Sequence, residues 1–354
     1  MLTFCTLFDE NYIDKGLVLY KSLERVCDDF TLYILCMSER CFEILADLNF
    51  KHLHPVSLKE FENEALLKVK AERTVAEYCW TCSSSLTSYI METYQPEYCS
   101  YIDADMCFYD NPQVLIDEME RRNASVSIVG HRFKKSVAEE RSRKVGKYCV
   151  ECNTFKNDEN GRYVLDLWTK ECLDYCSADG DGIHWADQKY MDNWPDEFPF
   201  VIETENYGAG VAPWNIAQYK LVSNDGNKVI LKCRNNKYKL LFYHFAGITY
   251  LNIDIARIHV FNQWGVSEKL TYLLYDEYLS EIDYYKRMLK AEYGIENIIK
   301  QHPGVAKIEK SPWKVRIKHI LLSIKDLSVG KYLNDLPILI HGRKDYRRII
   351  RKAI

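Results

Sequence analysis

The sequence has no long apolar run, and stretches of this kind, such as residues 320–322, are short. A helix that crosses a membrane needs about 20 consecutive apolar residues, so no such helix is expected. A basic segment at the start is also lacking, because residues 2–6 enter an apolar, strand-like stretch directly. No secretory signal is therefore expected.

A glycine-rich phosphate loop is lacking where two large classes of nucleotide-binding enzyme carry one. The first expected strand, residues 2–6, is followed by residues 8–12, Phe-Asp-Glu-Asn-Tyr. In those enzymes glycines at this point let the backbone approach the phosphates. Dinucleotide oxidoreductases and P-loop NTPases are both disfavoured.

A disulfide framework is not indicated, although the chain has thirteen cysteines. Their number is odd, and several lie in apolar contexts, namely Cys5, Cys36, Cys99 and Cys107. Such residues are typical of free buried thiols, which points to the reducing cytoplasm. Cys79/Cys82 and Cys149/Cys152 have the spacing of zinc half-sites, but the pairs lie far apart and within an expected helix or strand, so structural zinc is not expected.

The composition is that of a globular protein, with 47% hydrophobic and 28% charged residues. The length of 354 residues supports one large domain with an appendage, or two domains. The formal charge of −4 hides an asymmetry: residues 301–354 carry thirteen Lys and Arg against four Asp and Glu. The tail is thus a separate basic unit on an acidic chain, and the acidic part disfavours nucleic-acid binding.

Strands and helices are expected to alternate from the beginning of the chain. Residues 2–6, residues 31–36 and a short stretch near residues 52–55 predict strands, while Asp14 and Ser38 are expected to cap helices between them. Alternation of this kind builds a parallel sheet with right-handed crossovers. The expected fold class is therefore α/β.

Two acids follow a strand that must be buried. Residues 98–102 are apolar and aromatic, and Asp103 and Asp105 come directly after them. Side chains two residues apart on an extended chain point the same way, so both carboxylates can face one divalent cation. Ligands of parallel α/β sheets bind at this end of the strands. The alternative interpretation is a solvated turn. The buried strand before the acids argues against it, because a turn acid does not usually follow such a strand.

Three later stretches carry further candidate residues. Residues 150–156 predict a strand with Asn153 near its centre, and Asp187 and Gln188 are expected in the first turn of a short helix. Residues 208–210, Gly-Ala-Gly, suit either a pocket wall or an ordinary tight bend. Residues 239–247 predict a last core strand with His244 at its end, where this imidazole could complete a site that favours Mn²⁺ over Mg²⁺.

Five segments in this order resemble a known family: residues 4–9, 101–105, 185–190, 208–215 and 243–245. They are similar to bacterial nucleotide-diphospho-sugar transferases of the GT-A fold, near glycosyltransferase family 8. The resemblance covers residues 1 to about 265. It implies a catalytic domain over residues 1–270, with a mostly parallel central sheet flanked by helices, and leaves a helical basic region over residues 271–354.

The resemblance implies a metal-dependent glycosyltransferase that takes a sugar from a nucleoside-diphosphate donor, expected to be a UDP-sugar, to a glycan or lipid-linked acceptor. It assigns Mn²⁺ or Mg²⁺ to Asp103, Asp105 and His244. It assigns Asp187 and Gln188 to catalysis. The residues that it places at the donor are Thr6, Leu7, Phe8, Lys70, Arg73, Ala104, Asn153 and Gly247. The residues that it places on the acceptor side are Gly208, Ala209 and Gly210.

The chain departs from the family at two points. After the histidine, members often carry His-Phe-X-Gly-X-X-Lys-Pro-Trp, whereas residues 244–252 here contain no lysine. Members also usually carry an arginine on the helix before the acids, where this chain has Ser84, Ser85 and Leu86. Lys70 or Arg73 is the expected substitute for that charge.

The stereochemical course and the class of activity stay open at this point. If the sugar is inverted, Asp187 is the expected base; if it is retained, Asp187 and Gln188 position the reactants. The runner-up enzyme is a sugar-1-phosphate nucleotidyltransferase, which needs a glycine-rich loop that is missing here. A binding protein of the same fold without turnover is the other alternative.

The basic tail predicts an amphipathic helix. Apolar residues recur at helical spacing between positions 313 and 327, with Lys and Arg between them, and residues 343–352 add a second basic cluster. Such a helix either lies on an anionic membrane surface, here the inner face of the plasma membrane, or docks on the catalytic domain.

Overall fold

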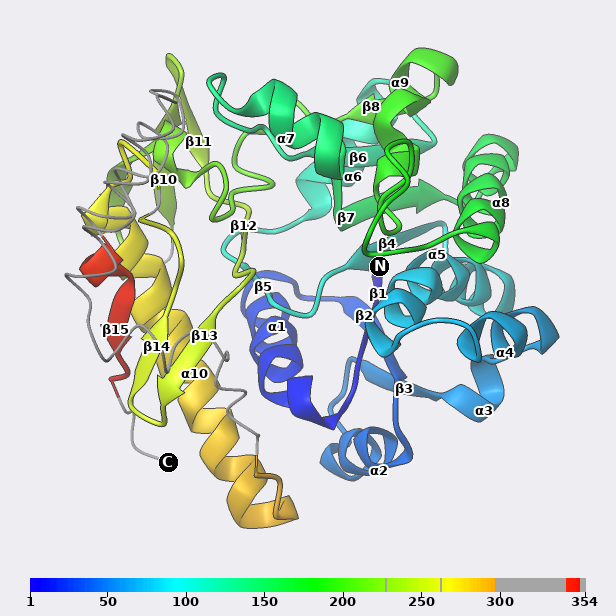
Figure 1. The fold of residues 1–354 in the computed structure, drawn as a ribbon, viewed down its shortest axis with the longest axis horizontal. Coiled ribbons are helices and arrows are strands. Elements are labelled where there is room, and N and C mark those ends of the chain that lie inside the picture. Colours follow the sequence, from blue (N-terminus) through cyan, green and yellow to red (C-terminus); the bar gives the residue numbers. More distant parts are fainter. Residues whose placement is uncertain (227, 262, 297–341, 351–354) are drawn as a thin grey trace, which may run out of the picture.

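The computed structural model describes residues 1–226, 228–261, 263–296 and 342–350 (Figure 1). In this part of the chain, seven strands form a central sheet in the order β3-β2-β1-β4-β7-β6-β8. Every neighbouring pair is parallel except the two that β7 makes with β4 and β6. The expected α/β class with a mostly parallel central sheet is therefore confirmed.

The central strands are β1 (Leu2–Phe8), β2 (Phe30–Cys36), β3 (Leu53–Ser57), β4 (Tyr98–Ile102), β6 (Val126–Gly130), β7 (Tyr148–Lys156) and β8 (Val201–Glu203). The helices around them are α1 (Ile13–Val26), α2 (Glu39–Leu48), α3 (Leu58–Phe61), α4 (Glu64–Lys70), α5 (Val75–Tyr94), α6 (Gln113–Arg121), α7 (Ala138–Val145), α8 (Glu159–Asp174) and α9 (Trp194–Glu197). Short 3-10 turns are η1 (Glu10–Tyr12), η2 (Lys189–Asn193) and η3 (Ile216–Gln218).

Helix starts follow from capping side chains. Ser38 accepts a hydrogen bond from the backbone N–H of Cys41 at the start of α2, as expected, and Thr74 opens α5 with a full capping box. The expectation for Asp14 was wrong. Tyr12 occupies the cap position of α1, and Asp14 lies buried in the first turn with its Oδ1 accepting from the N–H of Lys15.

The sheet is covered on both faces, which explains the nearly continuous apolar character of its strands. Phe4 and Leu32 pack with α1 and α2 in one hydrophobic cluster, while Cys5 and Leu35 pack with α5 and α8 in another. All thirteen cysteines are free thiols, and all except the half-buried Cys79 are buried. The expected buried thiols are thus confirmed.

Three smaller sheets complete the described part of the chain. Strand β5 (Met106–Phe108) pairs with β12 (Phe242–His244), and β9 (Tyr219–Asn224), β10 (Val229–Cys233) and β11 (Asn236–Lys239) form a second sheet. The third contains β13 (Thr249–Asn252), β14 (Ile255–Arg257) and β15 (Tyr346–Arg348). The single core strand expected over residues 239–247 was wrong, because the chain leaves one sheet at Lys239 and enters another at Phe242.

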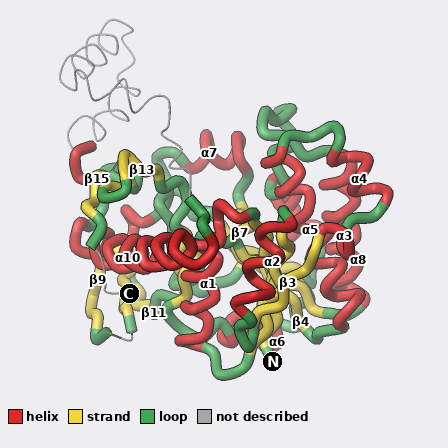
Figure 2. The backbone as a smooth tube through the Cα atoms, turned by 90° about the horizontal axis from the view of Figure 1, so that it is seen from below, coloured by secondary structure: helices red, strands yellow, loops and turns green. Residues whose placement is uncertain are grey.

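The long helix α10 (Glu268–Tyr293) packs along α1 and shares a hydrophobic cluster with β12 (Figure 2). After residues 297–341, which lie outside the description together with the amphipathic stretch expected there, the chain returns as η4 (Gly342–Asp345) and β15. Arg347 binds both carboxylate oxygens of Asp276 on α10, at 2.9 and 2.6 Å. None of the helices in the described residues has the length and apolar character that crossing a membrane requires.

Candidate active site

The two expected metal-binding acids lie in the turn between β4 and β5, at the carboxyl end of a central parallel strand. Hydrogen bonds of the backbone hold this turn on both sides. The N–H of Asp103 donates to the carbonyl of Glu151 on β7 over 3.1 Å, and the N–H of Phe245 donates to the carbonyl of Asp105 over 2.8 Å. The turn is therefore tied both to the sheet and to the segment that carries His244.

His244 ends β12, which runs antiparallel to β5 with His244 opposite Met106. Its Nε2 lies 3.0 Å from Oδ1 of Asp105 and 3.7 Å from Oδ2 of Asp103. One ligand atom from each of the three residues falls within 4.8 Å of the other two. The structure thus brings two neighbouring acids together with a histidine some 140 positions later in the sequence.

The donor set fits a divalent cation of the first transition series. Two carboxylates and one imidazole form the mixed oxygen and nitrogen set that suits Mn²⁺, whereas Mg²⁺ and Ca²⁺ prefer oxygen alone. Neighbouring ligands of an ion with bonds of ~2.1 Å lie about 3 Å apart, close to the separation between His244 and Asp105. Asp103, Asp105 and His244 would therefore hold the ion.

The charges of the cluster influence each other strongly. Burial raises the pKa of Asp103 to about 6, with His244 opposing the rise and Asp105 and Glu151 adding to it. Burial also acts to raise the pKa of Asp105, but the charge and hydrogen bond of His244, together with the charge of Lys15, leave it below its usual value. The free site is thus a compact cluster in which the imidazole offsets the repulsion between the acids.

Asp187 lies close enough to interact electrostatically with this cluster. The residue is 5% exposed, and its carboxylate accepts a hydrogen bond from the Ser83 hydroxyl at 2.7 Å. Burial, with a contribution from the charge of Asp103, raises the pKa of Asp187 to about 7. The residue before it, Ala186, is buried with φ +49°, a backbone conformation that costs free energy outside glycine.

The amide of Gln188 binds the backbone of a neighbouring segment: its Nε2 donates to the carbonyl of Val145 over 2.6 Å. Asp187 and Gln188 precede η2 rather than occupying the first turn of an α-helix, so the expected helix is replaced by a 3-10 turn. The backbone carbonyl of Asp187 accepts from the Trp168 indole at 2.7 Å. Packing against α8 therefore fixes this segment.

The residues expected at the donor are found in different surroundings. Thr6 is fully buried on β1, and its hydroxyl has no partner in the described structure. Phe8 is also buried, and its ring occupies the space where a side chain at Gly16 would lie. Asn153 is buried on β7, with Nδ2 donating to the Met191 sulfur at 3.2 Å and Oδ1 unpartnered in the described structure.

The remaining donor residues flank the acids or line open space. Leu7 is half-buried on β1, and Ala104 is 7% exposed between the two acids. Gly247 follows β12 with φ +77° and open space where a side chain would project. A Cβ at Gly247 would therefore meet no neighbouring atom within 4 Å.

The two basic substitutes already have partners. Lys70 pairs with Glu62. Arg73 donates to the carbonyls of Cys172 and Leu173 at 2.7 and 2.6 Å, which joins the start of α5 to the end of α8. Both cations therefore have partners within the protein.

Residues 208–210 are all buried. A Cβ at Gly208 would lie 1.8 Å from the carbonyl oxygen of Lys239, and one at Gly210 would lie 3.1 Å from Oε1 of Glu151. The glycines thus permit close backbone packing behind the site, which corresponds to the tight-bend interpretation of this segment.

Two further residues interact with the acid cluster and were not predicted from the sequence, Glu151 and Lys15. Glu151 is completely buried, and its Oε2 lies 2.8 Å from Nδ1 of His244. An acid among Cys149, Val150 and Cys152 is a signal that could have identified it. Lys15 places its Nζ 3.3 Å from the centre of the Tyr12 ring, at the start of α1.

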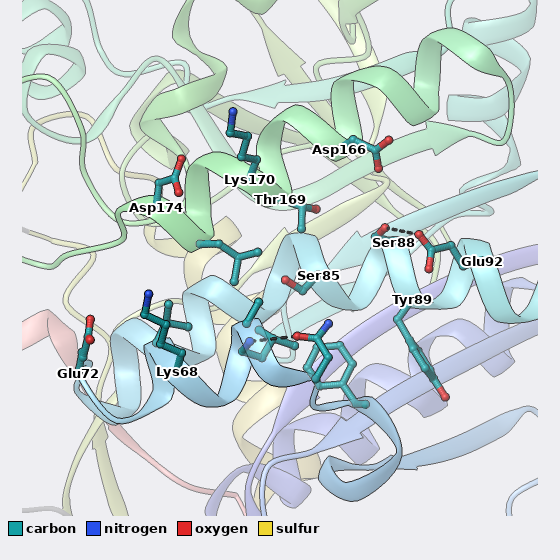
Figure 3. A pocket seen from close by; sticks show the side chains of 16 residues that line it. Lys68, Glu72, Ser85, Ser88, Tyr89, Glu92, Asp166, Thr169, Lys170 and Asp174 are labelled. Atoms are coloured by element: carbon teal, nitrogen blue, oxygen red, sulfur yellow. Dashed lines mark hydrogen bonds between the residues drawn. The ribbon is translucent and has the colours of Figure 1, made fainter.

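A cavity of about 700 Å³ lies between α4, α5 and α8 (Figure 3). Figure 3 shows Ser85, Ser88 and Glu92 of α5 on one wall, facing residues of α8 such as Asp166 and Lys170. None of the expected metal, donor or acceptor residues lines it. The cavity is therefore separate from the acid cluster.

Among solved structures, the chain is similar to mouse xyloside xylosyltransferase 1, at 12% identity and a TM-score of 0.43 over 69% of this chain and 97% of that one. It is also similar to the galactosyltransferase LgtC in complex with donor and acceptor sugar analogues, at 14% identity and a TM-score of 0.45 over 70% and 87%. Both likenesses are too weak to assign an activity.

No family model matches the chain. Two curated proteins of Bacillus subtilis (strain 168) are similar to it over most of their length. The uncharacterized protein YfnF is 31% identical over 297 residues, which are 82% of this chain and 96% of YfnF. The uncharacterized protein YfnD is 30% identical over 249 residues, 70% of this chain and 78% of YfnD. The chain therefore belongs to the family of YfnF and YfnD.

Proposed function

We propose that this protein is a metal-dependent glycosyltransferase that moves a sugar from a nucleoside-diphosphate donor to a glycan or lipid-linked acceptor. The observation that carries the proposal is the convergence of Asp103, Asp105 and His244 at the carboxyl end of β4. The order of motifs that resembles family 8 supports it, and a UDP-sugar is the proposed donor. A divalent cation bound there would supply Lewis-acid stabilisation of the departing diphosphate.

The residues around the cluster have complementary tasks in this proposal. The charge of Lys15 acts to lower the pKa of Asp105. Lys15 is therefore proposed to face the diphosphate, in place of the lysine that family members carry after the histidine. Asp187 is proposed to face the acceptor. A pKa near 7 suits a base that accepts a proton from a sugar hydroxyl, and the same carboxylate serves to orient the reactants if the sugar is retained.

A proposed location follows from the basic tail. Residues 301–354 carry an excess of cations that favours the surface of an anionic membrane, where a lipid-linked acceptor would be found. Two of these cations are engaged within the protein: Lys344 contacts Glu268, and Arg347 binds Asp276. The other eleven cations of residues 301–354 are the ones proposed to contact the membrane.

A screen for donor hydrolysis tests the activity. The purified chain is incubated with several nucleotide sugars, with Mn²⁺ or with a chelator, and the products are separated. Release of nucleoside diphosphate only with metal is expected. Pyrophosphate would instead indicate a nucleotidyltransferase, and the absence of both products would indicate a binding protein.

Substitutions locate that activity at the site. Asp103→Asn is expected to lower the metal-dependent rate by at least about 10²-fold, because the cluster loses one charged ligand. Asp117→Asn is the matched control, since this acid is exposed on α6 and bonds only to Gln113 on the same helix in the described structure. Equal rates in the two variants would refute the assignment of the site.

A further inference from the structure

Glu151 is a carboxylic acid in the interior of the central sheet. It lies in the middle of β7, its exposed fraction is 0%, and its neighbours Val150 and Cys152 are buried as well. A carboxylate in such a place loses its hydration, which costs several kcal/mol unless a charged or hydrogen-bonding partner compensates. An apolar residue would be the ordinary choice at this position, so the partner of Glu151 indicates its role.

The partner is the histidine of the metal cluster. Oε2 of Glu151 lies 2.8 Å from Nδ1 of His244, while Oε1 has no hydrogen-bond partner in the described structure. The backbone reinforces the contact, because the carbonyl of Glu151 accepts from the N–H of Asp103. Gly210, with φ +73°, packs closely here, since a Cβ there would lie 2.5 Å from Cγ1 of Val129 and 3.1 Å from Oε1 of Glu151. One residue of β7 therefore touches two of the three expected ligands.

The contact with Glu151 determines which nitrogen of the imidazole can bind a cation. A neutral imidazole has one N–H donor and one nitrogen with a free electron pair. When Nδ1–H donates to Glu151, the free pair is left on Nε2, the atom that faces Asp105 at 3.0 Å. The carboxylate also makes the ring a stronger base and prevents its rotation.

We propose that Glu151 is a positioning residue that fixes the tautomer and orientation of His244 so that Nε2 binds the cation, without being a ligand itself. This inference rests on the metal site proposed above and not on the sugar or acceptor. It also explains why a buried acid is kept in a strand whose neighbouring residues are apolar.

A competing arrangement uses the same side chains differently. Cys149, Glu151 and His244 have ligand atoms within 4.8 Å of one another and could form a metal site on the Nδ1 side of the ring. The separation of 2.8 Å between Oε2 and Nδ1 is that of a charge-assisted hydrogen bond. Two ligands of one ion with bonds of ~2.1 Å would lie about 3 Å or more apart. The side chains of Asp103 and Asp105 are also 30% and 17% exposed, whereas that of Glu151 is fully buried, so an ion that must meet a substrate is favoured on the Nε2 side and Glu151 as a positioning residue.

Metal affinity tests the proposal without any sugar transfer. The dissociation constant of Mn²⁺ is measured from the paramagnetic resonance of the free ion for the full chain and its variants. Glu151→Gln, which keeps the volume but removes the charge, is expected to weaken binding about 10- to 100-fold. Cys149→Ala, on the same strand and beside the same histidine, is the matched control and is expected to keep the affinity. Wild-type affinity in folded Glu151→Gln would overturn the proposal.

Two spectra of the wild-type chain test the proposal even if Glu151→Gln does not fold. With Mg²⁺ bound, the ¹⁵N–¹H correlations of His244 are expected to show the proton on Nδ1; a proton on Nε2 would overturn the proposal. With Co²⁺ bound, no charge-transfer band from a thiolate is expected. Such a band, absent from Cys149→Ala, would show that the Nδ1 side holds the metal. If donor hydrolysis fails but these results hold, only the proposed transferase activity is refuted.

Discussion

At the scale of single residues, Asp187 combines burial, a raised pKa and a strained neighbour. Its carboxylate is held by Ser83, its backbone carbonyl by Trp168, and Ala186 before it has a positive φ. Strain and perturbed pKa values both concentrate at functional sites. The surrounding packing thus holds an acid whose pKa is raised to about 7.

The raised pKa of Asp187 predicts a dependence of stability on pH. A group whose pKa rises from 3.8 to about 7 on folding adds stability below pH ~4, and this contribution is lost as the pH rises through 7. Asp187→Asn removes the titration. Relative to the wild type, its melting temperature is expected to be higher at pH 8 than at pH 5 by an amount corresponding to about 1 kcal/mol or more. The same difference at both pH values in thermal denaturation would contradict the prediction.

Lys15 predicts a selective effect on phosphate binding. Lys15→Met is expected to weaken the binding of uridine diphosphate about 10-fold in the presence of Mn²⁺, because one charge-assisted hydrogen bond is lost. Uridine itself should bind as before. Lys21→Met, on the same helix but paired with Glu24, is the control for calorimetric titration. Equal affinities in the two variants would exclude Lys15 from the donor site.

Part of the site was predictable because its signals are local. Asp103 and Asp105 follow a buried strand directly, and His244 stands at the end of an aromatic stretch. Glu151 was not predictable in the same way, since its role arises from the antiparallel pairing of β7 with β4. Arg73 was predicted at the donor because its charge suits a phosphate, and in the fold it donates to two carbonyls of α8, a contact that the sequence does not reveal.

At the scale of elements, the fold was predictable where a helix cap or an apolar run marks a boundary. The alternation of β1, α1, β2, α2 and β3 follows from such signals. The pairing of β5 with β12 does not, because it joins segments more than 130 residues apart. Residues 239–247 look continuous in sequence, yet tertiary hydrogen bonds divide them. Leu241 donates to the carbonyl of Gly208, and its own carbonyl accepts from Tyr109.

Gly208 is the point where this arrangement is most sensitive to added volume. Gly208→Ala would place a Cβ 1.8 Å from a backbone oxygen that cannot move freely, with an expected loss of roughly 2–3 kcal/mol in unfolding free energy. Gly247→Ala has open space and is expected to lose only about 1 kcal/mol for its positive φ. Denaturant titration of both variants measures the difference, and a larger loss for Gly247→Ala would contradict it.

At the scale of the whole molecule, the basic tail predicts binding to anionic surfaces although the rest of the chain is acidic. The full chain is expected to sediment with vesicles that contain anionic lipid at low salt, and not with neutral vesicles or at high salt. Replacement of Lys314, Arg316, Lys318 and Lys325 by Gln should keep the protein in the supernatant. In the control variant, four exposed lysines within residues 1–300 are replaced by Gln and the tail is left unchanged. Sedimentation that is unchanged in the tail variant would exclude this stretch as the membrane contact.

The pairing of β15 with β14 limits how the tail can be removed in such an experiment. Strand β15 covers one side of β14, and Arg347 neutralises Asp276 on α10. Truncation before residue 342 would leave β14 as an open sheet edge, with unpaired backbone groups that can template association between chains. A shortened protein that precipitates would therefore report on self-association rather than on lost membrane contacts, and charge replacement within the intact chain is the sounder design.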